Sequence, residues 1–518
     1  MLLRASLLLA FLVLSESAAA RNAGPAMSGI IGLYIHEQWP YKHPYSPRTW
    51  SLEDWRGYAT GLRRLGYNTV MIWPMLEIIP EPLTDSDRHS LEIDARVIDM
   101  LHHQLGMRVL IVMCPNIVAA PGAAREPFTE RHFFWSTQLV DPRDRPAVAR
   151  MMYWRQELFG YLRAADGLAM IDSDPGGYPH SDNAAFVSLL ALHRQMLDGL
   201  RPGIELDYWV LAGWRAWGEF LGGGRLRWGT EDEFVDTLTR LKHLNPEPWG
   251  LLNGLQSPQN DDLIGKDLHY IGATGLESRV ISYNYGAIEF EPSLPVTNFG
   301  GTQAQAAGAA RSARGVLSNT QTPCMQLPNT FAFVRGALSQ PVRHADYVEF
   351  ADRLIVDQGP LIVDSWEALS SADASGMRQQ VERLRRLRHG ELRLGDLGGL
   401  LFGDGHRFVE DLALELELRA AYQDMKVATE SGRGKKSALL QLATATTQWQ
   451  QATGFQARWN LPEVETDLRK VGSPAIDAVF AEPDVSTASA VSRFHEREET
   501  FMPRLIEALT QAANTARD

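Results

Sequence analysis

The 518-residue sequence has little cysteine and no long apolar segment beyond its first residues. Its only cysteines are Cys114 and Cys324, which are far apart and each follow a strand-like run. Two cysteines cannot by themselves form a cysteine-based zinc site, and we expect two buried free thiols rather than a disulfide. The single apolar run near the start is too short to span a bilayer, so membrane insertion is not expected.

Several motifs that indicate a particular chemistry are also missing. No Gly-x-Gly-x-x-Gly follows a strand-like run, which disfavours a dinucleotide-binding sheet. His-x-His, His-Glu-x-x-His and Gly-x-Ser-x-Gly are absent, so zinc-protease and serine-hydrolase chemistry are disfavoured. The run 222–224 is Gly-Gly-Gly but lacks the Lys-Ser/Thr of a phosphate-binding loop. We therefore predict that the protein holds no metal ion and no cofactor.

Basic residues are fewer than acidic ones: the chain has 50 Lys and Arg and 63 Asp and Glu, which gives a net charge of −13. This balance argues against nucleic acid and anionic membranes as partners. Hydrophobic residues make up 45% of the chain, enough for a sizeable core. The 14 tryptophans are a weak indication of sugar binding, since indole rings also serve as core residues.

Residues 1–20 have the features of a secretory signal peptide. Arg4 supplies the positive region, residues 7–14 the apolar region, and residues 18–20 a small-residue cleavage site. We therefore expect a secreted or periplasmic protein. The alternative is a cytoplasmic protein that starts at Met27.

Strand-like and helix-like segments alternate from residue 28 to residue 345. Leu65-Gly66 and Leu105-Gly106 each lie between a helix and a strand, forty residues apart, which indicates repeated βα units. Eight such units predict a closed (β/α)8 TIM barrel over residues 28–345. The expected strands are residues 30–35, 68–73, 108–113, 168–171, 206–211, 250–255, 279–283 and 315–317. The expected barrel helices run from a capping box at residues 51–54 to residue 65, and over about residues 91–105, 146–162, 183–200 and 231–244.

Helical periodicity dominates residues 346–518, which we predict to form a mainly helical C-terminal domain packed on the barrel. Residues 462–486 have no clear pattern and are expected to be a connection. The expected helices are residues 347–356, 374–387, 408–428, 436–453 and 493–513.

The most informative stretch is residues 168–182, where an apolar strand-like run is followed by Asp172, Ser173 and Asp174. Alternate residues of a strand share a face, so the two carboxylates are expected to point the same way. As the end of the fourth strand, they would lie at the C-terminal rim of the barrel, where active sites are found. The alternative is structural, with Asp174 starting a turn and Asp172 accepting backbone hydrogen bonds.

The other predicted strand ends carry aromatic, amide and ionisable side chains, a mixture that suits a polyhydroxylated ligand. Asp172, Asp174, Glu37 and His132 are the candidate catalytic residues, since proton transfer requires carboxylates or histidine. The candidate substrate-binding residues are His36, Trp39, Trp73, Arg131, His180, Trp214, Tyr283, Asn284, Asn319, Gln326 and Asn329.

The chain resembles the exported (β/α)8 glycoside hydrolases, particularly hexosaminidase- and sialidase-like barrels with a helical C-terminal domain. The resemblance rests on residues 32–37 (Gly-Leu-Tyr-Ile-His-Glu), residues 171–177 (Ile-Asp-Ser-Asp-Pro-Gly-Gly), and Asn319 with residues 326–329 (Gln-Leu-Pro-Asn). It implies exo-acting release of a terminal acidic or N-acetylated sugar from a glycan substrate.

The sequence departs from this family pattern at one important place. The adjacent Asp-Glu pair of barrel hexosaminidases is missing, and Asp172-Ser173-Asp174 stands in its region. If the chain instead resembles an inverting barrel-type sialidase, an acidic residue would pair with a histidine, either His132 or His36. A sialic acid carboxylate would also require an arginine, and the arginines near predicted strand ends are Arg125, Arg131, Arg215 and Arg335.

Two other function classes stay open. A non-catalytic carbohydrate-binding barrel would use the same rim residues without turnover. A metal-dependent hydrolase would use Asp172, Asp174, His180 and Asp182 as ligands, although residues 175–177 interrupt that set. Self-association into a homo-oligomer and the stereochemical outcome are not decided by the sequence.

Overall fold

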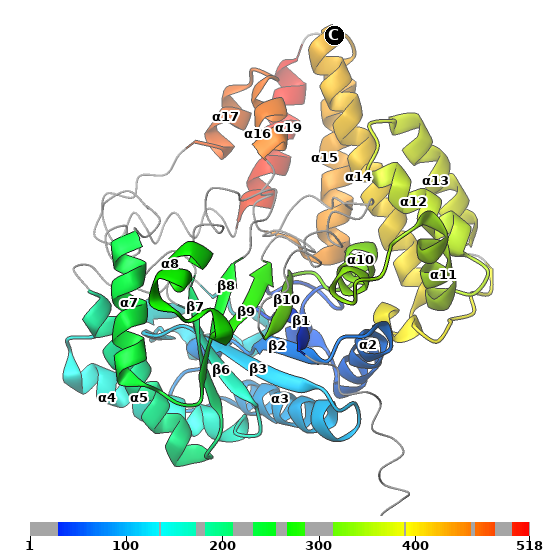
Figure 1. Cartoon of the computed structure of the whole chain (residues 1–518). Coiled ribbons are helices and arrows are strands. Elements are labelled where there is room, and N and C mark those ends of the chain that lie inside the picture. Colours follow the sequence, from blue (N-terminus) through cyan, green and yellow to red (C-terminus); the bar gives the residue numbers. More distant parts are fainter. Residues whose placement is uncertain are drawn as a thin grey trace, which may run out of the picture.

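Eight parallel strands close into a barrel in the computed structural model, which confirms the predicted fold. The structure describes residues 29–133, 136–171, 182–210, 231–254, 267–284, 314–387, 390–456, 462–481 and 500–516. The expected signal peptide and Met27 lie outside these residues. The strands run in the order β1-β10-β9-β8-β7-β6-β3-β2 (Figure 1). Their bounds are β1 Ile30–His36, β2 Thr69–Trp73, β3 Arg108–Met113, β6 Gly167–Ile171, β7 Glu205–Val210, β8 Trp249–Gly254, β9 Val280–Asn284 and β10 Gly315–Thr320.

Helices that follow the strands surround the barrel. Most coincide with predicted segments, but α8 and α10 were not predicted. In α10 nearly every residue is buried, so the segment has no polar face from which a helical period could be recognised. The barrel helices are α2 Leu52–Leu65, α3 Asp85–His103, α4 Arg145–Tyr161, α5 Asn183–Leu200, α7 Glu231–Leu244, α8 Asp267–Thr274 and α10 Leu327–Ala337.

The loop after β3 is longer than a simple connection and has structure of its own. It contains an antiparallel hairpin of β4 (Ile117–Ala119) and β5 (Thr137–Leu139). It also contains two short 3-10 helices, η3 (Ala123–Arg125) and η4 (Phe128–Glu130). Further 3-10 helices follow other strands or link helices, namely η1 Pro47–Thr49, η2 Leu76–Ile78, η5 Glu277–Arg279 and η6 Gly398–Leu401.

The strand register decides which side chains face the barrel interior. Neighbours in register on parallel strands point to the same side, and His36 pairs with Trp73 while Tyr34 pairs with Asn319. Tyr34 contacts Trp209 of β7, with ring centroids 5.2 Å apart. Since β1 and β7 are not neighbours in the sheet, this contact crosses the interior. The interior set therefore includes Tyr34, His36, Trp73 and Asn319.

The C-terminal region is helical, as predicted, with two differences. Helix α12 was not predicted, and the segment expected to be a connection contains α16 and α17. The helices are α11 His344–Leu354, α12 Gly359–Leu369, α13 Ala374–Leu387, α14 Gly405–Ser431, α15 Lys435–Thr453, α16 Pro462–Arg469, α17 Pro474–Val479 and α19 Phe501–Thr515.

Two hydrophobic clusters join these helices to the barrel. The first extends without a break from the barrel into α11–α14 and η6. The second joins α14, α15 and α19 to loop residues after β1 and β10, including Trp39, Tyr41 and Cys324. These three helices therefore lie at the end of the barrel toward which the strands point (Figure 1).

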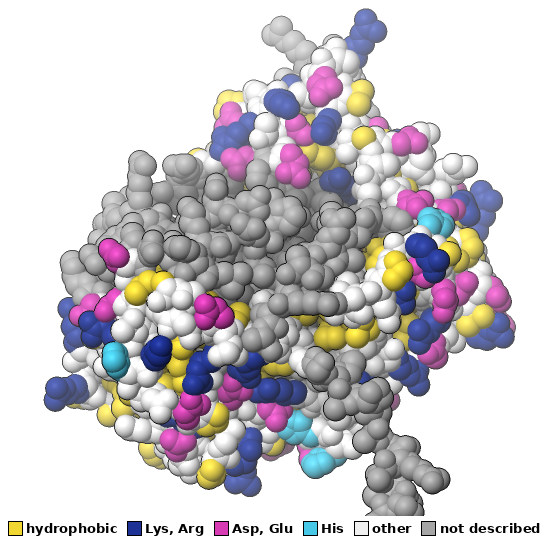
Figure 2. Space-filling view, viewed as in Figure 1, with side chains coloured by type: hydrophobic (Ala, Val, Ile, Leu, Met, Phe, Trp, Pro, Cys, Tyr) yellow, Lys and Arg dark blue, Asp and Glu magenta, His cyan; other side chains and the backbone are white. Residues whose placement is uncertain are grey.

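Both cysteines are buried and neither forms a disulfide, as predicted. Among the described helices, none is long and apolar enough to cross a membrane. Figure 2 shows basic and acidic side chains interspersed over the described part of the visible face. On that face the net negative charge is not gathered into a patch of one sign.

Candidate active site

His36 lies in the interior at the C-terminal end of β1 and is almost fully buried. Its ring is 4.0 Å from that of Tyr34 and 6.0 Å from that of Trp73, centroid to centroid. Burial lowers the pKa of His36 to about 3, although the side chains of Asn319 and Gln38 act in the opposite direction. The imidazole is therefore neutral at physiological pH, with one nitrogen that donates and one that accepts.

Trp73 is held at the end of β2 by a carboxyl group that follows it in the chain. Its Nε1 donates to Oε2 of Glu77 at 3.2 Å, and Oε1 of Glu77 accepts from the backbone N of Cys114 at 2.5 Å. Burial raises the pKa of Glu77, and the hydrogen bond from Cys114 is the largest opposing effect. Glu77 was not among the predicted site residues. Its four-residue distance from Trp73, on the first turn after the strand, was the available signal.

A buried arginine fixes the loop after β3. The Nη2 atom of Arg155 donates to the carbonyl oxygens of Cys114 and Ile117, and Nη1 donates to that of Pro115 at 2.8 Å. Nη1 also donates to Nε2 of His193 at 2.7 Å, while Nδ1 of His193 donates to the carbonyl of Leu189. Burial and the charge of Arg155 lower the pKa of His193 to about 3, so this imidazole is neutral and serves as an acceptor.

The remaining predicted residues at the ends of β9 and β10 are buried amides and a phenol. Tyr283 faces the interior, where its ring is 4.8 Å from that of Trp209. Asn329 donates through Nδ2 to Oε1 of Gln326 at 2.9 Å, so these two amides form a buried pair at the start of α10. The side chain of Asn284 is outside the described set.

Trp39 has a packing role. Its ring stacks on Tyr41, which in turn stacks on Phe455, with centroid distances of 5.8 and 4.5 Å. Its Nε1 donates to Oε1 of Gln321. Trp39 thus joins the loop after β1 to the C-terminal helical region.

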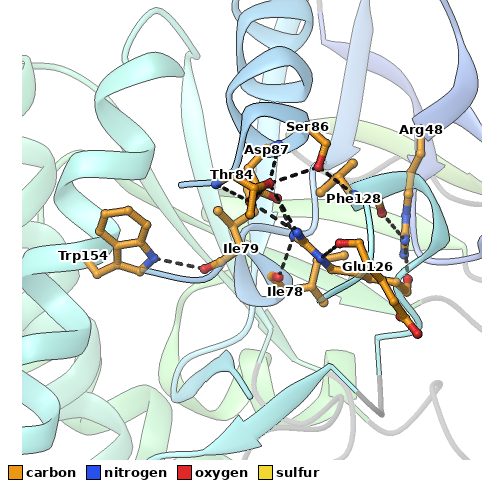
Figure 3. Close-up of polar contacts among 10 residues, drawn as sticks. Arg48, Ile78, Ile79, Thr84, Ser86, Asp87, Glu126, Phe128 and Trp154 are labelled. Atoms are coloured by element: carbon orange, nitrogen blue, oxygen red, sulfur yellow. Dashed lines mark hydrogen bonds and ion pairs between the residues drawn. The ribbon is translucent and has the colours of Figure 1, made fainter. Parts of the chain in front are cut away.

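Arg131 is fully engaged within the protein, which gives it a structural role. Figure 3 shows its partners Ile78, Thr84, Asp87 and Glu126. Its guanidinium forms a two-pronged ion pair with Asp87, whose side chain also caps the N-terminus of α3. The other acceptors are the carbonyls of Glu126 and Ile78 and Oγ1 of Thr84. The five N–H donors meet five acceptors, so no donor is left for the substrate carboxylate that the sequence led us to expect.

Arg48 connects the loops after β1 and β3. Figure 3 shows it beside Phe128 of the second loop. It donates to the backbone carbonyls of Glu37 and Gln38 on one side, and to those of Phe128 and Arg131 on the other. Two catalytic-rim loops that are about 90 residues apart in sequence are therefore held by one side chain.

Glu37 differs in orientation from the interior set. It follows His36, and its side chain lines a cavity beside α2 and α3 together with Asp94. Burial raises the pKa of Glu37 well above its usual range, the nearby Asp94 carboxyl raises it further, and Arg48 opposes the shift. Its assignment as a catalytic residue at the barrel mouth stays a prediction, and this geometry does not favour it.

The other predicted site residues lie in a loop or outside the described part of the chain. His132 is half-buried in the loop after η4. Asp172, Asp174, His180 and Trp214 lie outside the described residues. The structure thus brings His36, Trp73, Tyr283 and Asn319 together in the interior and assigns Trp39 and Arg131 to packing.

The opposite, N-terminal end of the barrel contains a charge network. Glu205 forms ion pairs with Arg108 and Arg314, and Asp207 lies 3.6 Å from Arg314. Burial, followed by the charge of Glu205, raises the pKa of Asp207 to about 8. Active sites of TIM barrels lie at the C-terminal ends of the strands, so we interpret this network at the N-terminal ends as structural. Among the described residues, no group of three or more His, Cys, Asp or Glu could hold a metal ion.

No protein-family model matches the sequence, and no curated protein matches it either. Several solved structures are similar to it at low identity, with TM-scores below 0.5. A mutant of Thermobaculum terrenum O-GlcNAc hydrolase is 11% identical over 91% of this chain and 93% of that chain, with a TM-score of 0.44. Dispersin B is 11% identical over 60% and 99%, with a TM-score of 0.35. A dihydrodipicolinate synthetase-like protein from Pseudomonas aeruginosa is 13% identical over 75% and 99%, with a TM-score of 0.33. Because such different proteins score alike, these similarities concern the barrel fold alone.

Proposed function

We propose that the protein is an exo-acting glycoside hydrolase that releases a terminal acidic or N-acetylated sugar. The observation that supports this best is the buried cluster of uncharged polar and aromatic side chains formed by His36, Trp73, Tyr283 and Asn319 near the C-terminal ends of the barrel strands. Neutral donors and acceptors beside aromatic rings match the hydroxyl groups and apolar faces of a sugar ring.

Catalysis requires a proton donor at the glycosidic oxygen and a second group that acts as base or nucleophile. Asp172 and Asp174 follow Ile171 in the sequence, and Ile171 ends β6 in the barrel wall. They are therefore the candidates for the acid or the base: one of them acts directly, and the other orients it or raises its pKa. Neutral His36 would hydrogen-bond a sugar hydroxyl without competing for the proton.

The sugar class can be narrowed within this proposal. A sialic acid requires an arginine for its carboxylate, but the donors of Arg131 are all used by the protein. An N-acetylated sugar without a carboxylate therefore suits the described residues better. Arg125 and Arg335 are alternatives, although Arg335 already donates to the carbonyl of Pro341.

The test is release of aryl-linked N-acetylhexosamine and sialic acid by the purified protein and its variants. Asp172→Asn or Asp174→Asn should lower kcat by at least about a hundredfold, in the range expected for loss of general acid–base catalysis. Asp182→Asn is the matched control, because Asp182 accepts from the backbone N of Ala185 at the start of α5. It should change stability little, because asparagine caps a helix about as well as aspartate, and it should keep turnover.

Two other outcomes would redirect the proposal. If both Asp172→Asn and Asp174→Asn keep wild-type kcat, these residues are not the catalytic pair. Glycan binding on an array without hydrolysis of any bound glycan would favour a carbohydrate-binding barrel.

Export is likewise proposed from residues 1–20, and the mass of the mature protein after expression with its natural N-terminus would test cleavage near Ala20.

A further inference from the structure

A cavity of about 770 Å³ lies outside the barrel interior, between η1, α2, α3 and η4. It is lined by two buried carboxyl groups, Glu37 and Asp94, by the exposed carboxylate of Glu53, and by the aromatic side chains of Trp50, Trp55 and Phe128. None of the neutral residues assigned to the proposed sugar site lines it. It is therefore a separate feature, and its role does not depend on the proposed function.

The two buried carboxyl groups of this cavity are incompletely paired. Glu37 is 1% exposed and Asp94 5% exposed. Among the described residues, neither Oε1 of Glu37 nor Oδ2 of Asp94 has a hydrogen-bond partner. A buried carboxyl oxygen without a partner is costly, so the arrangement is explained if a ligand supplies the missing donors.

The basic groups around the cavity do not fill this need. Arg48 donates to four backbone carbonyls, and Arg56 is paired with Glu53. His89 and Arg96 of α3 are exposed, where water and salt screen their charge. The two buried oxygens are thus free to accept from a cation that enters the cavity.

We propose that this cavity binds a small organic ammonium ion, with the charged nitrogen between Glu37 and Asp94 and the carbon chain against Trp50, Trp55 and Phe128. The nitrogen supplies three donors, and aromatic faces stabilise a nearby cation. A divalent metal ion fits less well, because among the described residues no three acidic, cysteine or histidine side chains gather closely enough to hold one.

Binding should be linked to proton release. Burial raises the pKa of Asp94 to about 8, and that of Glu37 is raised as well. A proton held by the pair at neutral pH must leave when the ammonium ion binds. Affinity should therefore increase as pH rises from 6 to 8, by up to about tenfold per unit. The charged groups facing the pair from the surrounding elements are Arg48, Glu53, Arg56, His89 and Arg96.

Isothermal titration calorimetry with n-butylammonium tests the proposal on the full-length protein. We expect binding at pH 8 that weakens at pH 6, and no comparable binding of the neutral analogue 1-butanol. Glu37→Gln and Asp94→Asn should each weaken ammonium binding at least about tenfold. The matched control is Glu53→Gln, which removes an exposed carboxylate from the same cavity and should change affinity less than about threefold.

A measurement on the unmodified protein keeps the test decisive if a variant fails to fold. Calorimetry in two buffers of different ionisation enthalpy should detect release of up to about one proton per ammonium bound at pH 7. Absence of binding at pH 8, equal binding of 1-butanol, or binding without proton release at pH 7 would overturn the proposal. Because no turnover is measured, these outcomes do not bear on glycoside hydrolysis.

Discussion

Arg131 and Glu37 are buried ionisable residues that the fold accommodates in opposite ways. Each donor of Arg131 has an acceptor, and its charge is matched by that of Asp87. The carboxyl group of Glu37 instead faces another buried acid and has an oxygen without a partner among the described residues. A satisfied buried ion is a structural element, whereas an unsatisfied one indicates a place where a ligand or proton is exchanged.

Replacing Arg131 with methionine should therefore be strongly destabilising. The substitution leaves the carboxylate of Asp87 buried without its cation, which typically costs about 3–5 kcal/mol. Urea-induced unfolding of Arg131→Met measures the loss. Arg143→Met is the control, because Arg143 forms an exposed ion pair with Asp141 and should cost less than about 1 kcal/mol. Equal effects of the two substitutions would contradict the structural role of Arg131.

Asp207 should make stability depend on pH. Its pKa is about 8 in the folded protein, above the value near 4 expected in the unfolded chain. The stability associated with its protonated form is therefore complete below about pH 4 and is lost as pH rises through 8. Asp207→Asn, which cannot ionise, should flatten the dependence of the unfolding free energy between pH 5 and 8. Unfolding in urea at both pH values measures this. Asp99→Asn, at an exposed position of α3, should retain the wild-type slope.

At the scale of elements, the end of α15 is fixed by a contact with the loop after β1. Gly454 and Gly432 are the C-caps of α15 and α14, with φ of +74° and +68°. A Cβ at Gly454 would lie 2.9 Å from the backbone N of Lys42, whereas a Cβ at Gly432 would have nothing within 4 Å. The two glycines thus share a backbone conformation and differ in surroundings.

This difference predicts the effects of two matched substitutions. Gly432→Ala should cost about 1–2 kcal/mol, the usual penalty of a left-handed conformation for a residue with a Cβ. Gly454→Ala should cost at least about 1 kcal/mol more, since the new methyl group also displaces the Lys42 backbone. Chemical unfolding of both variants measures the difference. Similar losses of stability in the two variants would mean that the contact between the end of α15 and the loop after β1 can open at no cost in free energy.

The elements that the sequence predicts are those whose pattern is local. All eight barrel strands were expected at or near their observed positions, because buried apolar runs alternate with capped amphipathic helices such as α2. Helix α10 escaped prediction because it is buried on nearly all sides. The start of α3 was placed six residues late, because the Thr84–Asp87 capping box precedes its apolar stripe.

The candidate site shows the same division between local and distant information. The position of His36, Trp73 and Asn319 at strand ends follows from the βα pattern and the barrel rule. The role of Arg131 could not be predicted, since its partner Asp87 is 44 residues away. Trp39 likewise packs toward Phe455, on a part of the chain more than 400 residues later.

At the scale of the whole molecule, the barrel and the first C-terminal helices share one core. Leu400 of η6 would collide with a Cβ at Gly61 of α2, and both Phe350 and Trp366 belong to the same hydrophobic cluster as the barrel strands. A sequence division near residue 345 therefore separates segments whose apolar surfaces cover each other.

We accordingly expect the barrel and helices α11–α14 to unfold together. Differential scanning calorimetry of the full chain should show one transition for this unit. A chain ending at residue 343 exposes the surface that η6 and α11–α14 cover, so it should have a lower Tm or fail to fold. Two well-separated transitions, with the shorter chain retaining the Tm of one of them, would show instead that the barrel is autonomous.

The bonds of Arg48 also affect how this barrel can be altered by evolution or by protein engineering. Exchange of single rim loops is the usual route to new barrel chemistry, because each loop is normally an independent insertion. Here the loops after β1 and β3 meet at one guanidinium that bonds the backbone of both. A donor loop that lacks a matching carbonyl would leave Arg48 partly unsatisfied and would disturb the other loop as well. The two loops should therefore be inherited, and transplanted, as a single unit.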